Sequence, residues 1–449
     1  MSSSPRYDSK KVDPSPLGQP LKFEFSGKSA PNRFLKGAMT ERLSSWSPTD
    51  LKARGIPSDN LINVYKRWGQ GGLGLILTGN IMIYPDQLEA AGNPIIPADA
   101  PFSGERFEAF KKLGAAAKAE GSLIVGQVSH PGRQVEERIQ KNPVSASDVQ
   151  LTGEVMGMHF AKPHAASEGE IQEIIEGFAH AAEYLEKAGY DGIQLHSAHG
   201  YLLAQFLSQT TNQRTDKYGG SLENRGRLIV EIADAVRSRT SPSFVLGIKL
   251  NSVEFQDKGF APEEAQELVK TLEAHKFDFV ELSGGTYESL AFTHKRESTK
   301  AREAFFMDFA DAIVPSIKKT KTYVTGGFKT VGAMVDALQT VHGVGLARPV
   351  CQEPRFGKDV LAGKVTGAIK QRFDEANFGL TNVVAGTQIR QIGKDQEPFD
   401  GSNEKSEQGL LTDMKAWMGG LGADEKFEKY GYIDIDSIPA VPYGGVAAS

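Results

Sequence analysis

The chain has 449 residues, of which 24% are charged, with a formal net charge of -5 at pH 7 and a single cysteine, Cys351. This length suits one large domain or two ordinary ones, and either can bury a substantial core. The near-neutral charge provides no basic field for nucleic acid or an anionic membrane, so small-molecule chemistry is expected. One cysteine excludes an intramolecular disulfide and any site that needs several thiolates from one chain.

The N-terminus contains no apolar core of signal-peptide length, and no run of eighteen apolar residues occurs in the chain. We therefore expect a soluble cytoplasmic protein with no membrane partner. The first ordered element is expected to be a short hairpin, since Leu21, Phe23 and Phe25 alternate with polar residues. Such a hairpin can close the floor of a barrel.

Eight short apolar runs alternate with amphipathic segments along the chain, a rhythm typical of parallel strands joined by helices. Eight strands predict an α/β fold of the (β/α)8 TIM-barrel type. A doubly wound sheet usually has fewer strands and an early Gly-rich turn, and no GxGxxG follows the first run here. The runs are FLKGAM from Phe34, LGLILT from Leu73, SLIVGQV from Ser122, DGIQLH from Asp191, SFVLGIKL from Ser243, FDFVELS from Phe277, TYVTGG from Thr322 and GVGLA from Gly343.

The segments between these runs have the signals of helices. Ser167 and Glu170 form a capping-box pattern, an apolar stripe runs on to Leu185, and Gly189 is expected to end that helix. A later helix is expected to start at Pro262. These apolar stripes are interpreted as core.

The chain is expected to divide into three parts. We expect residues 1–20 to be a flexible N-terminus and residues 21–372 to be the barrel with its hairpin cap. Residues 373–449 are expected to form a C-terminal extension that packs on the barrel or on a partner, so a homodimer is one alternative. Within the barrel, residues 134–166 are too long for a simple strand-to-helix link and predict an excursion on the catalytic face.

The C-terminal extension contains an apolar stripe at helical spacing, which we expect to pack on the barrel of the same chain rather than on a second subunit. Residues 436–449 are expected to form a loose tail. The stripe consists of Leu410, Leu411, Met414, Trp417, Met418 and Leu421.

Titratable side chains cluster after the fourth run, where a barrel places its chemistry. His196 and His199 are three apart and can converge only in a turn past the strand end, which Gly200 favours. Two neutral imidazoles could then donate hydrogen bonds to one oxygen on which negative charge develops. The phenol of Tyr201, with a reference pKa of about 10, could deliver a proton to carbon.

A metal site is the alternative interpretation of the two histidines. It needs further ligands at other strand ends, where the sequence has Gln127, Lys249 and Ser283, with Glu281 as the one nearby carboxylate. An amide and a lysine are poor metal ligands but suit a heteroaromatic ring with carbonyl and nitrogen acceptors. The residues therefore favour an organic cofactor and no metal.

The last two runs end in residues suited to a phosphate. Gly326 and Gly327 follow the seventh run, and Ala347 and Arg348 follow the eighth. Glycine allows the backbone to approach an anion, arginine supplies charge, and barrels commonly bind phosphate at these two places.

The run from His196 to Arg225, HSAHGYLLAQFLSQTTNQRTDKYGGSLENR, closely resembles the signature of the old yellow enzyme family, the FMN-dependent ene-reductases. The resemblance extends over roughly residues 30–365. It implies a barrel that holds FMN noncovalently and is reduced by NADH or NADPH. By the same resemblance, His196 and His199 bind the substrate oxygen and Tyr201 is the proton donor.

Further site residues come from the resemblance and, for Tyr287, from the aromatic character of a loop. Lys249 stands where most members have an arginine beside the flavin, so it keeps the positive charge but loses the two-pronged geometry. Tyr287 is a candidate substrate contact in the loop after the sixth run. The cofactor-binding set that the resemblance implies is Ala38, Met39, Thr40, Asn80, Gln127, Lys249, Gly326, Gly327, Ala347 and Arg348.

These inferences predict an NAD(P)H-dependent flavin oxidoreductase that transfers hydride to the activated C=C bond of α,β-unsaturated carbonyl or nitro compounds. Two alternatives remain open. One is a flavoprotein of the NAD(P)H oxidase type, and the other is a metal-dependent barrel lyase or hydrolase.

Overall fold

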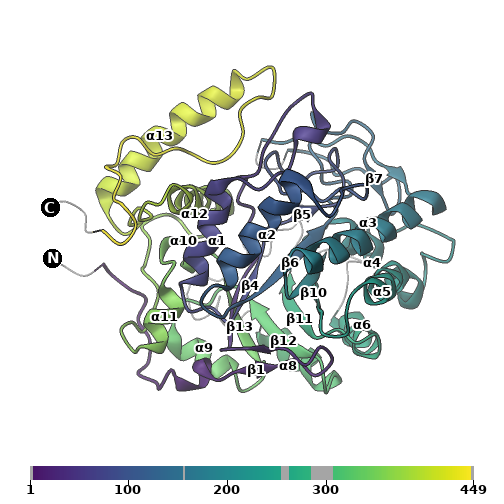
Figure 1. The fold of residues 1–449 in the computed structure, drawn as a ribbon, viewed down its shortest axis with the longest axis horizontal. Coiled ribbons are helices and arrows are strands. Elements are labelled where there is room, and N and C mark those ends of the chain that lie inside the picture. Colours follow the sequence, from purple (N-terminus) through teal and green to yellow (C-terminus); the bar gives the residue numbers. More distant parts are fainter. Residues whose placement is uncertain (1–3, 155–156, 254–261, 285–306, 446–449) are drawn as a thin grey trace.

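The computed structural model describes residues 4–154, 157–253, 262–284 and 307–445. Its centre is a closed barrel of eight parallel strands in the order β3-β4-β6-β9-β10-β11-β12-β13, with β13 pairing back to β3 (Figure 1). Each strand overlaps one of the eight apolar runs, so the predicted barrel is confirmed, although several strands extend beyond the run by one to three residues. The strands are β3 (Phe34–Lys36), β4 (Leu75–Leu77), β6 (Leu123–Ser129), β9 (Gly192–Ser197), β10 (Val245–Val253), β11 (Phe279–Gly284), β12 (Lys321–Thr325) and β13 (Gly343–Leu346), and the short β5 (Ile81–Met82) pairs with β6.

Helices surround the barrel because their apolar faces pack on the outer faces of the strands (Figure 1). The predicted capping box is present at the start of α3, where Ser167 accepts from the N–H of Glu170 and the Glu170 side chain accepts from the N–H of Ser167. Gly189, with φ of 89°, ends that helix as expected. The barrel helices are α1 (Asp59–Gly69), α2 (Gly104–Lys118), α3 (Glu168–Lys187), α4 (Leu202–Leu207), α5 (Leu222–Arg239), α6 (Pro262–Ala274), α8 (Met307–Ile313), α9 (Val331–Ala337), α10 (Arg348–Gln352) and α11 (Phe356–Leu361), with short 3-10 turns at η1 (Ser15–Gly18), η2 (Leu51–Ala53) and η4 (Val314–Ser316).

The N-terminal hairpin fills one end of the barrel. Strands β1 (Leu21–Lys22) and β2 (Ser29–Ala30) pair antiparallel, and the ring of Phe23 is fully buried 5.8 Å from that of Phe279. Leu21, Phe23 and Ala30 belong to one cluster with apolar residues of β3, β4, β6, β10, β11 and β12. The hairpin therefore closes this end of the barrel and leaves the carboxyl ends of the strands for chemistry.

The N-terminal segment and residues 134–166 lie outside the barrel strands, and specific contacts hold both. The N-terminal segment contacts residues on both sides of α11, since Tyr7 N–H donates to Ala368 O after this helix and Arg6 forms an ion pair with Glu353 before it. Residues 134–166 contain the two short strands β7 (Val144–Ser145) and β8 (His164–Ala165), which pair parallel. The proposed division into residues 1–20, 21–372 and 373–449 stays a prediction.

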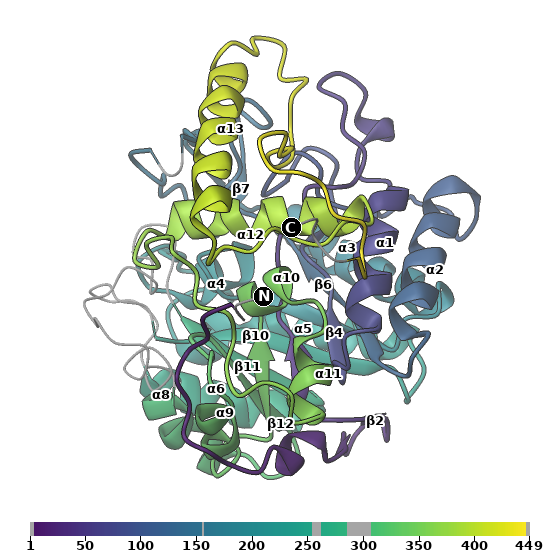
Figure 2. The ribbon, with the colours of Figure 1, turned by 90° about the vertical axis from the view of Figure 1, so that its left-hand side faces the viewer.

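The C-terminal extension consists of two long helices, α12 (Phe378–Gly393) and α13 (Glu404–Gly422), and an extended tail. Figure 2 shows α12 lying beside α1 and α13 crossing above it. Residues of α12, α13 and the tail share an apolar cluster in which Leu410 is fully buried. The stripe on α13 thus packs on the rest of the extension rather than directly on the barrel, and its outer members Leu411 and Met418 are exposed.

The expectation of a loose tail from residue 436 is wrong for its described part. The N–H groups of Asp436 and Ser437 donate to Asp413 Oδ2, each at 2.9 Å, and Tyr443 N–H donates to Asp395 O at 2.9 Å. The Tyr443 ring also lies under the guanidinium of Arg67, 4.3 Å from its centroid. Backbone pairing and cation–π contact hold the chain here, which composition alone does not reveal.

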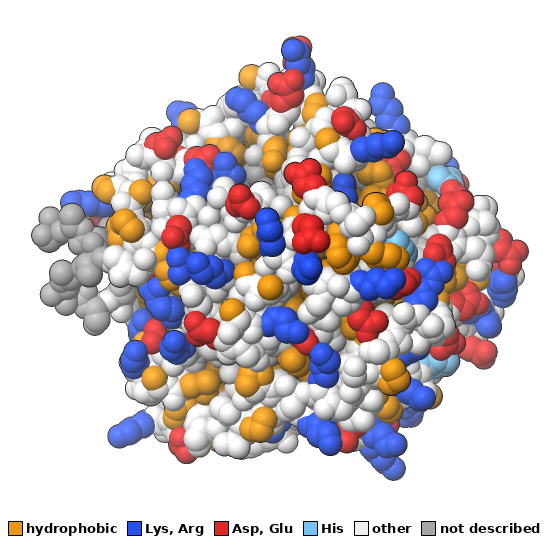
Figure 3. Space-filling view, in the orientation of Figure 1, with side chains coloured by type: hydrophobic (Ala, Val, Ile, Leu, Met, Phe, Trp, Pro, Cys, Tyr) orange, Lys and Arg blue, Asp and Glu red, His pale blue; other side chains and the backbone are white. Residues whose placement is uncertain are grey.

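The charged side chains on the surface are mixed in sign, in agreement with the small net charge. Figure 3 shows lysine and arginine side chains interspersed with aspartate and glutamate across the face it presents. No described helix is both long and apolar enough to cross a membrane.

Candidate active site

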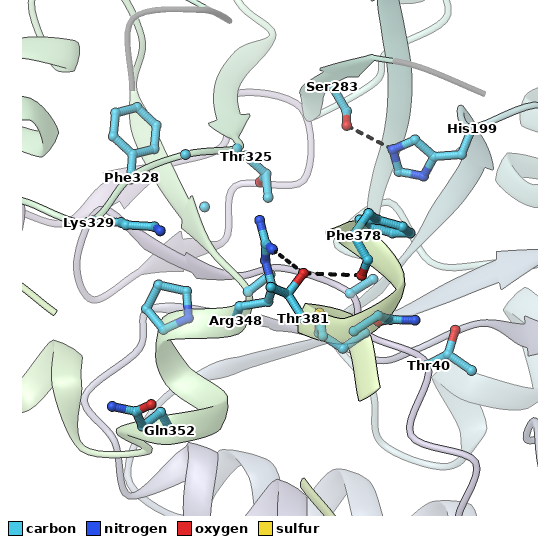
Figure 4. Close-up of a pocket in the computed structure, with 18 of the residues that line it drawn as sticks. Thr40, His199, Ser283, Thr325, Phe328, Lys329, Arg348, Gln352, Phe378 and Thr381 are labelled. Atoms are coloured by element: carbon cyan, nitrogen blue, oxygen red, sulfur yellow. Dashed lines mark hydrogen bonds between the residues drawn. The ribbon is translucent and has the colours of Figure 1, made fainter. Parts of the chain in front are cut away.

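A deep pocket opens at the carboxyl ends of the barrel strands. It encloses about 1670 Å³ of empty space, including its solvent-open mouth. Figure 4 shows side chains from the strand ends, from α10 and from α12 around it. Every residue of the predicted cofactor-binding set lines this pocket, as do His196, His199 and Tyr201.

The turn after β9 brings the two histidines and the tyrosine together. His199 adopts φ of 57° and Gly200 φ of 76°, so the chain reverses past the strand end as the sequence predicted. The imidazole centroids of His196 and His199 lie 5.3 Å apart, and the Tyr201 ring is 4.6 Å from that of His196. Tyr201 then caps the start of α4, whose first N–H, from Leu202, donates to His130 O at 3.0 Å. The three side chains are thus fixed to one rigid corner of the pocket.

Both imidazoles are neutral at physiological pH. Burial, followed by the positive charge of Lys249, places the pKa of His199 well below its usual value of 6.5. Burial also depresses the pKa of His196, with the neighbouring His199 and Lys249 as further causes. His196 Nδ1 accepts from the N–H of Ala198 at 3.3 Å, so the proton of the neutral ring belongs on Nε2, which can donate.

Ser283 is a site residue whose role the sequence did not suggest. Its Oγ lies 2.9 Å from His199 Nε2 (Figure 4). The backbone of His199 is held as well, with its N–H donating to Asn251 Oδ1 at 3.2 Å and its carbonyl accepting from Gln134 Nε2 at 3.1 Å. These contacts orient the second imidazole of the pair.

The two strands that flank β9 present an amide and an ammonium group at their ends. Gln127 on β6 and Lys249 on β10 are almost completely buried, and both line the pocket. The backbone N–H of Gln127 donates to Thr78 Oγ1 at 2.9 Å, which ties β6 to the loop after β4. The Lys249 ammonium lies 3.1 Å from Glu281 Oε1. This edge offers positive charge and amide hydrogen-bonding groups to a ligand.

The loop after β3 forms a further wall with Ala38, Met39 and Thr40. Thr40 Oγ1 donates to Glu89 Oε2 at 3.1 Å, and Glu89 also lines the pocket. Because the Thr40 hydroxyl hydrogen is used in this contact, its oxygen lone pairs remain the groups it can offer to a ligand. No sequence pattern pointed to Glu89, which lies 49 residues away from its partner.

The ends of β12 and β13 form the predicted anion-binding part of the pocket. Gly326 and Gly327 have φ of 148° and 80°, conformations that side-chain-bearing residues rarely adopt. Arg348 reaches from α10 into the pocket, where its Nη1 donates to Thr381 Oγ1 on α12 at 2.8 Å (Figure 4). Lys329 adds a second cation, which pairs with Glu375 beside Tyr7.

The residues present fit a phosphate-bearing heteroaromatic cofactor. Among the described residues, Asn80 Oδ1, Thr325 Oγ1 and Gln352 Nε2 are buried without a protein partner, and all three residues line the pocket. Buried polar atoms of this kind are normally satisfied, so they point to a polar ligand. Glycines and cations at one end, with an amide and ammonium at the other, match a phosphate and a ring carrying carbonyl groups.

The metal site, the alternative interpretation of the two histidines, lacks a set of ligands in the described part of the chain. Within those residues, no group of three or more His, Cys, Asp or Glu side chains is positioned to share a metal ion. Tyr287, the candidate substrate contact, lies outside the described residues. The pocket residues that sequence reasoning missed come mainly from distant segments, namely Tyr7, Glu89, Lys329, Gln371, Glu375, Phe378, Thr381 and Asn382.

A (β/α)8 barrel with this pocket at its strand ends is typical of flavin-dependent oxidoreductases. The chain belongs to the NADH:flavin oxidoreductase / NADH oxidase family, whose model matches residues 16–364. It is an NAD(P)H-dependent flavin oxidoreductase of the old yellow enzyme type, with FMN and NAD(P)H as cofactors.

Individual proteins are similar to this chain in sequence or in fold. The chain is 54% identical over 421 residues to the NADH-dependent flavin oxidoreductase nadA of Aspergillus parasiticus, covering 93% of this chain and 95% of that relative. Its fold is similar to that of morphinone reductase in complex with tetrahydroNAD, with a TM-score of 0.63 and 25% identity over 81% of this chain and 96% of that one. The old yellow enzyme homologue from Zymomonas mobilis has a TM-score of 0.65 and 22% identity, over 81% of this chain and 98% of that one.

Proposed function

We propose that this flavin oxidoreductase reduces the carbon–carbon double bond of small α,β-unsaturated carbonyl or nitro compounds with NADH or NADPH as the reductant. The observation that carries the proposal is the corner formed by His196, His199 and Tyr201, in which two neutral imidazoles and a phenol share one wall of the pocket. A donor pair with a nearby acid is the arrangement that reduction of a polarised alkene requires.

The three side chains of this corner have separate roles in the proposed reaction. His196 and His199 bind the carbonyl or nitro oxygen and stabilise the negative charge that develops there. Because the pKa of each imidazole is held below its usual value, the rings bind as neutral donors and do not protonate the oxygen. Tyr201 donates its proton to the α-carbon, and its position as the first residue before α4 keeps its ring beside His196.

When bound between these residues, FMN would supply the hydride-transfer chemistry that links the nicotinamide to the alkene. Gln127 and Lys249 would hold the pyrimidine end of the ring, Ala38, Met39, Thr40 and Asn80 its other edges, and Gly326, Gly327, Ala347 and Arg348 the phosphate. Pairing of two subunits, a cytoplasmic location and a substrate contact from Tyr287 stay predictions.

An anaerobic absorbance titration tests the proposal. The holoenzyme is reduced stepwise with NADH and, separately, with NADPH, and 2-cyclohexenone is then added without oxygen. We expect the flavin absorbance to bleach with the preferred nicotinamide and to return on addition of the enone, with cyclohexanone as the product. Cyclohexanone itself, which lacks the double bond, serves as the matched control.

The same experiment distinguishes the proposed function from that of an NAD(P)H oxidase. A flavoprotein of the NAD(P)H oxidase type would stay reduced after the enone is added and would regain its absorbance only with oxygen. That result would overturn the proposed substrate class and leave the family assignment intact.

A further inference from the structure

A chain of four buried polar side chains lies beneath the pocket. Gln127 Nε2 donates to Gln194 Oε1 at 2.7 Å, and Gln194 Nε2 donates to Glu281 Oε2 at 2.7 Å. The other carboxylate oxygen, Glu281 Oε1, lies 3.1 Å from Lys249 Nζ. The four residues come from the neighbouring strands β6, β9, β10 and β11, and none is more than 5% exposed.

Only the two ends of this chain reach the ligand. Gln127 and Lys249 line the pocket, whereas Gln194 and Glu281 lie in the layer below it. Strand pairing fixes the spacing, because Gln127 is in register with Gln194 and Lys249 with Glu281. Glu281 therefore contacts one pocket residue directly and reaches the other through a single amide.

A carboxylate at this position determines the direction of every hydrogen bond in the chain. An ionised carboxylate only accepts, so the Gln194 amide must direct its NH2 group toward Glu281. Its carbonyl oxygen then accepts from Gln127, whose own amide oxygen is left as the acceptor at the pocket end. An amide in place of Glu281 would accept or donate, and both amide orientations would become available.

We propose that Glu281 is a positioning residue of the FMN site, which holds Lys249 and, through Gln194, Gln127 against the pyrimidine edge of the ring and whose negative charge lowers the reduction potential of the bound flavin. The proposal rests on FMN binding and not on the substrate class proposed above. A buried carboxylate next to the ammonium offsets part of its positive charge, which otherwise favours the negatively charged reduced ring.

The test measures the midpoint potential of the flavin in the purified holoenzyme, without any alkene, for the wild type and two variants. Glu281→Gln removes the charge and nearly preserves the shape. We expect its oxidised–reduced equilibrium to shift at least tenfold toward the reduced flavin, which is about 30 mV in the positive direction for a two-electron couple. If the charge of Glu281 had no effect on the flavin, Glu281→Gln would release FMN but its midpoint potential would stay the same.

Gln194→Leu is the matched variant, because it breaks the chain and leaves both charges in place. We expect it to bind FMN at least threefold more weakly, as judged by the fluorescence of released FMN. Its oxidised–reduced equilibrium should differ from that of the wild type by less than tenfold, which is about 30 mV. If Glu281→Gln does not fold, Gln194→Leu still tests the positioning role of the chain. An unchanged or more negative potential in a folded, FMN-containing Glu281→Gln, or unchanged FMN affinity in Gln194→Leu, would overturn the proposal.

Because no substrate enters this experiment, its failure is distinct from failure of the proposed function. Enone reduction with an unshifted potential would remove the role of Glu281 alone. A shifted potential without enone reduction would remove the substrate class alone.

Discussion

Arg348, just past the last barrel strand, donates a hydrogen bond to Thr381 Oγ1 on α12 at 2.8 Å. The C-terminal extension thereby reaches the anion-binding part of the pocket, where Glu375, Phe378 and Asn382 join the lining. The extension packs on itself and on α1, so its position depends on the same apolar cluster that buries Leu410. Part of the pocket is therefore built by residues outside the barrel.

Replacing Thr381 with Val should weaken FMN binding by about three- to tenfold, because the Arg348 guanidinium loses a hydrogen bond that helps to hold it. The measurement is the dissociation constant from FMN fluorescence. Thr412→Val on α13 is the matched control, since the Thr412 hydroxyl bonds only within its own helix, to Gln408 O. Equal affinity in both variants would show that α12 does not support the phosphate site.

Replacing Tyr201 with Phe should slow reoxidation of the reduced flavin by an enone about a hundredfold or more, since the proton donor is lost. Reduction of the flavin by NAD(P)H needs no such proton and should change little. Stopped-flow absorbance measures the two half-reactions separately. Equal slowing of both would contradict the role of Tyr201.

Replacing Ser283 with Ala should weaken the binding of phenolic ligands about three- to tenfold, because the His199 ring loses the hydroxyl group that orients it. Spectral titration of the bound flavin with a phenol measures this affinity. Ser238→Ala serves as the control, since Ser238 does not line the pocket and bonds to Ala235 O on α5. His199→Ala should have a larger effect in the same assay, and identical phenol affinity in all variants would argue against an oxygen-binding pair.

His130 should make the free energy of unfolding depend on pH. It is almost completely buried, its Nδ1 accepts from the Gly132 N–H at 3.0 Å, and burial lowers its pKa to about 3. Between about pH 6.5 and pH 3 the unfolded chain binds the extra proton, so stability falls as the pH decreases, by up to about 1.4 kcal/mol per pH unit. The contribution is fully present above the unfolded pKa of about 6.5.

His130→Asn tests this dependence, because the amide oxygen can still accept from Gly132 while the titrating group is gone. Denaturant unfolding at about pH 7 and about pH 5 should show a smaller loss of stability in the variant than in the wild type, even if the variant is less stable at both. A loss of the same size in both proteins would contradict the assignment.

The barrel could be predicted from the sequence because each of its strands overlaps a short apolar run and some of its helices have local start and stop signals. Ser167 with Glu170, and Gly189 after them, are examples whose effect is local. The corner at His196, His199 and Tyr201 was predictable for the same reason, since three chemical groups lie within six residues.

The packing of the extension could not be predicted in this way. The stripe on α13 is visible in the sequence, but the surface that covers it is not. The tail after residue 436 has no strong pattern, yet Asp413 and Asp395 hold it in place.

By itself, the sequence determined the strand number, the turn after β9 and the chemical groups at the strand ends, because these follow from periodicity and from neighbours along the chain. Only the tertiary structure decided which distant groups meet: Glu281 beneath Gln127 and Lys249, Glu89 at Thr40, Ser283 at His199 and Thr381 at Arg348. Each of these contacts joins segments far apart in the chain, and barrel closure with the docking of α12 sets the distance between them. A pattern within one segment carries no information about such a distance.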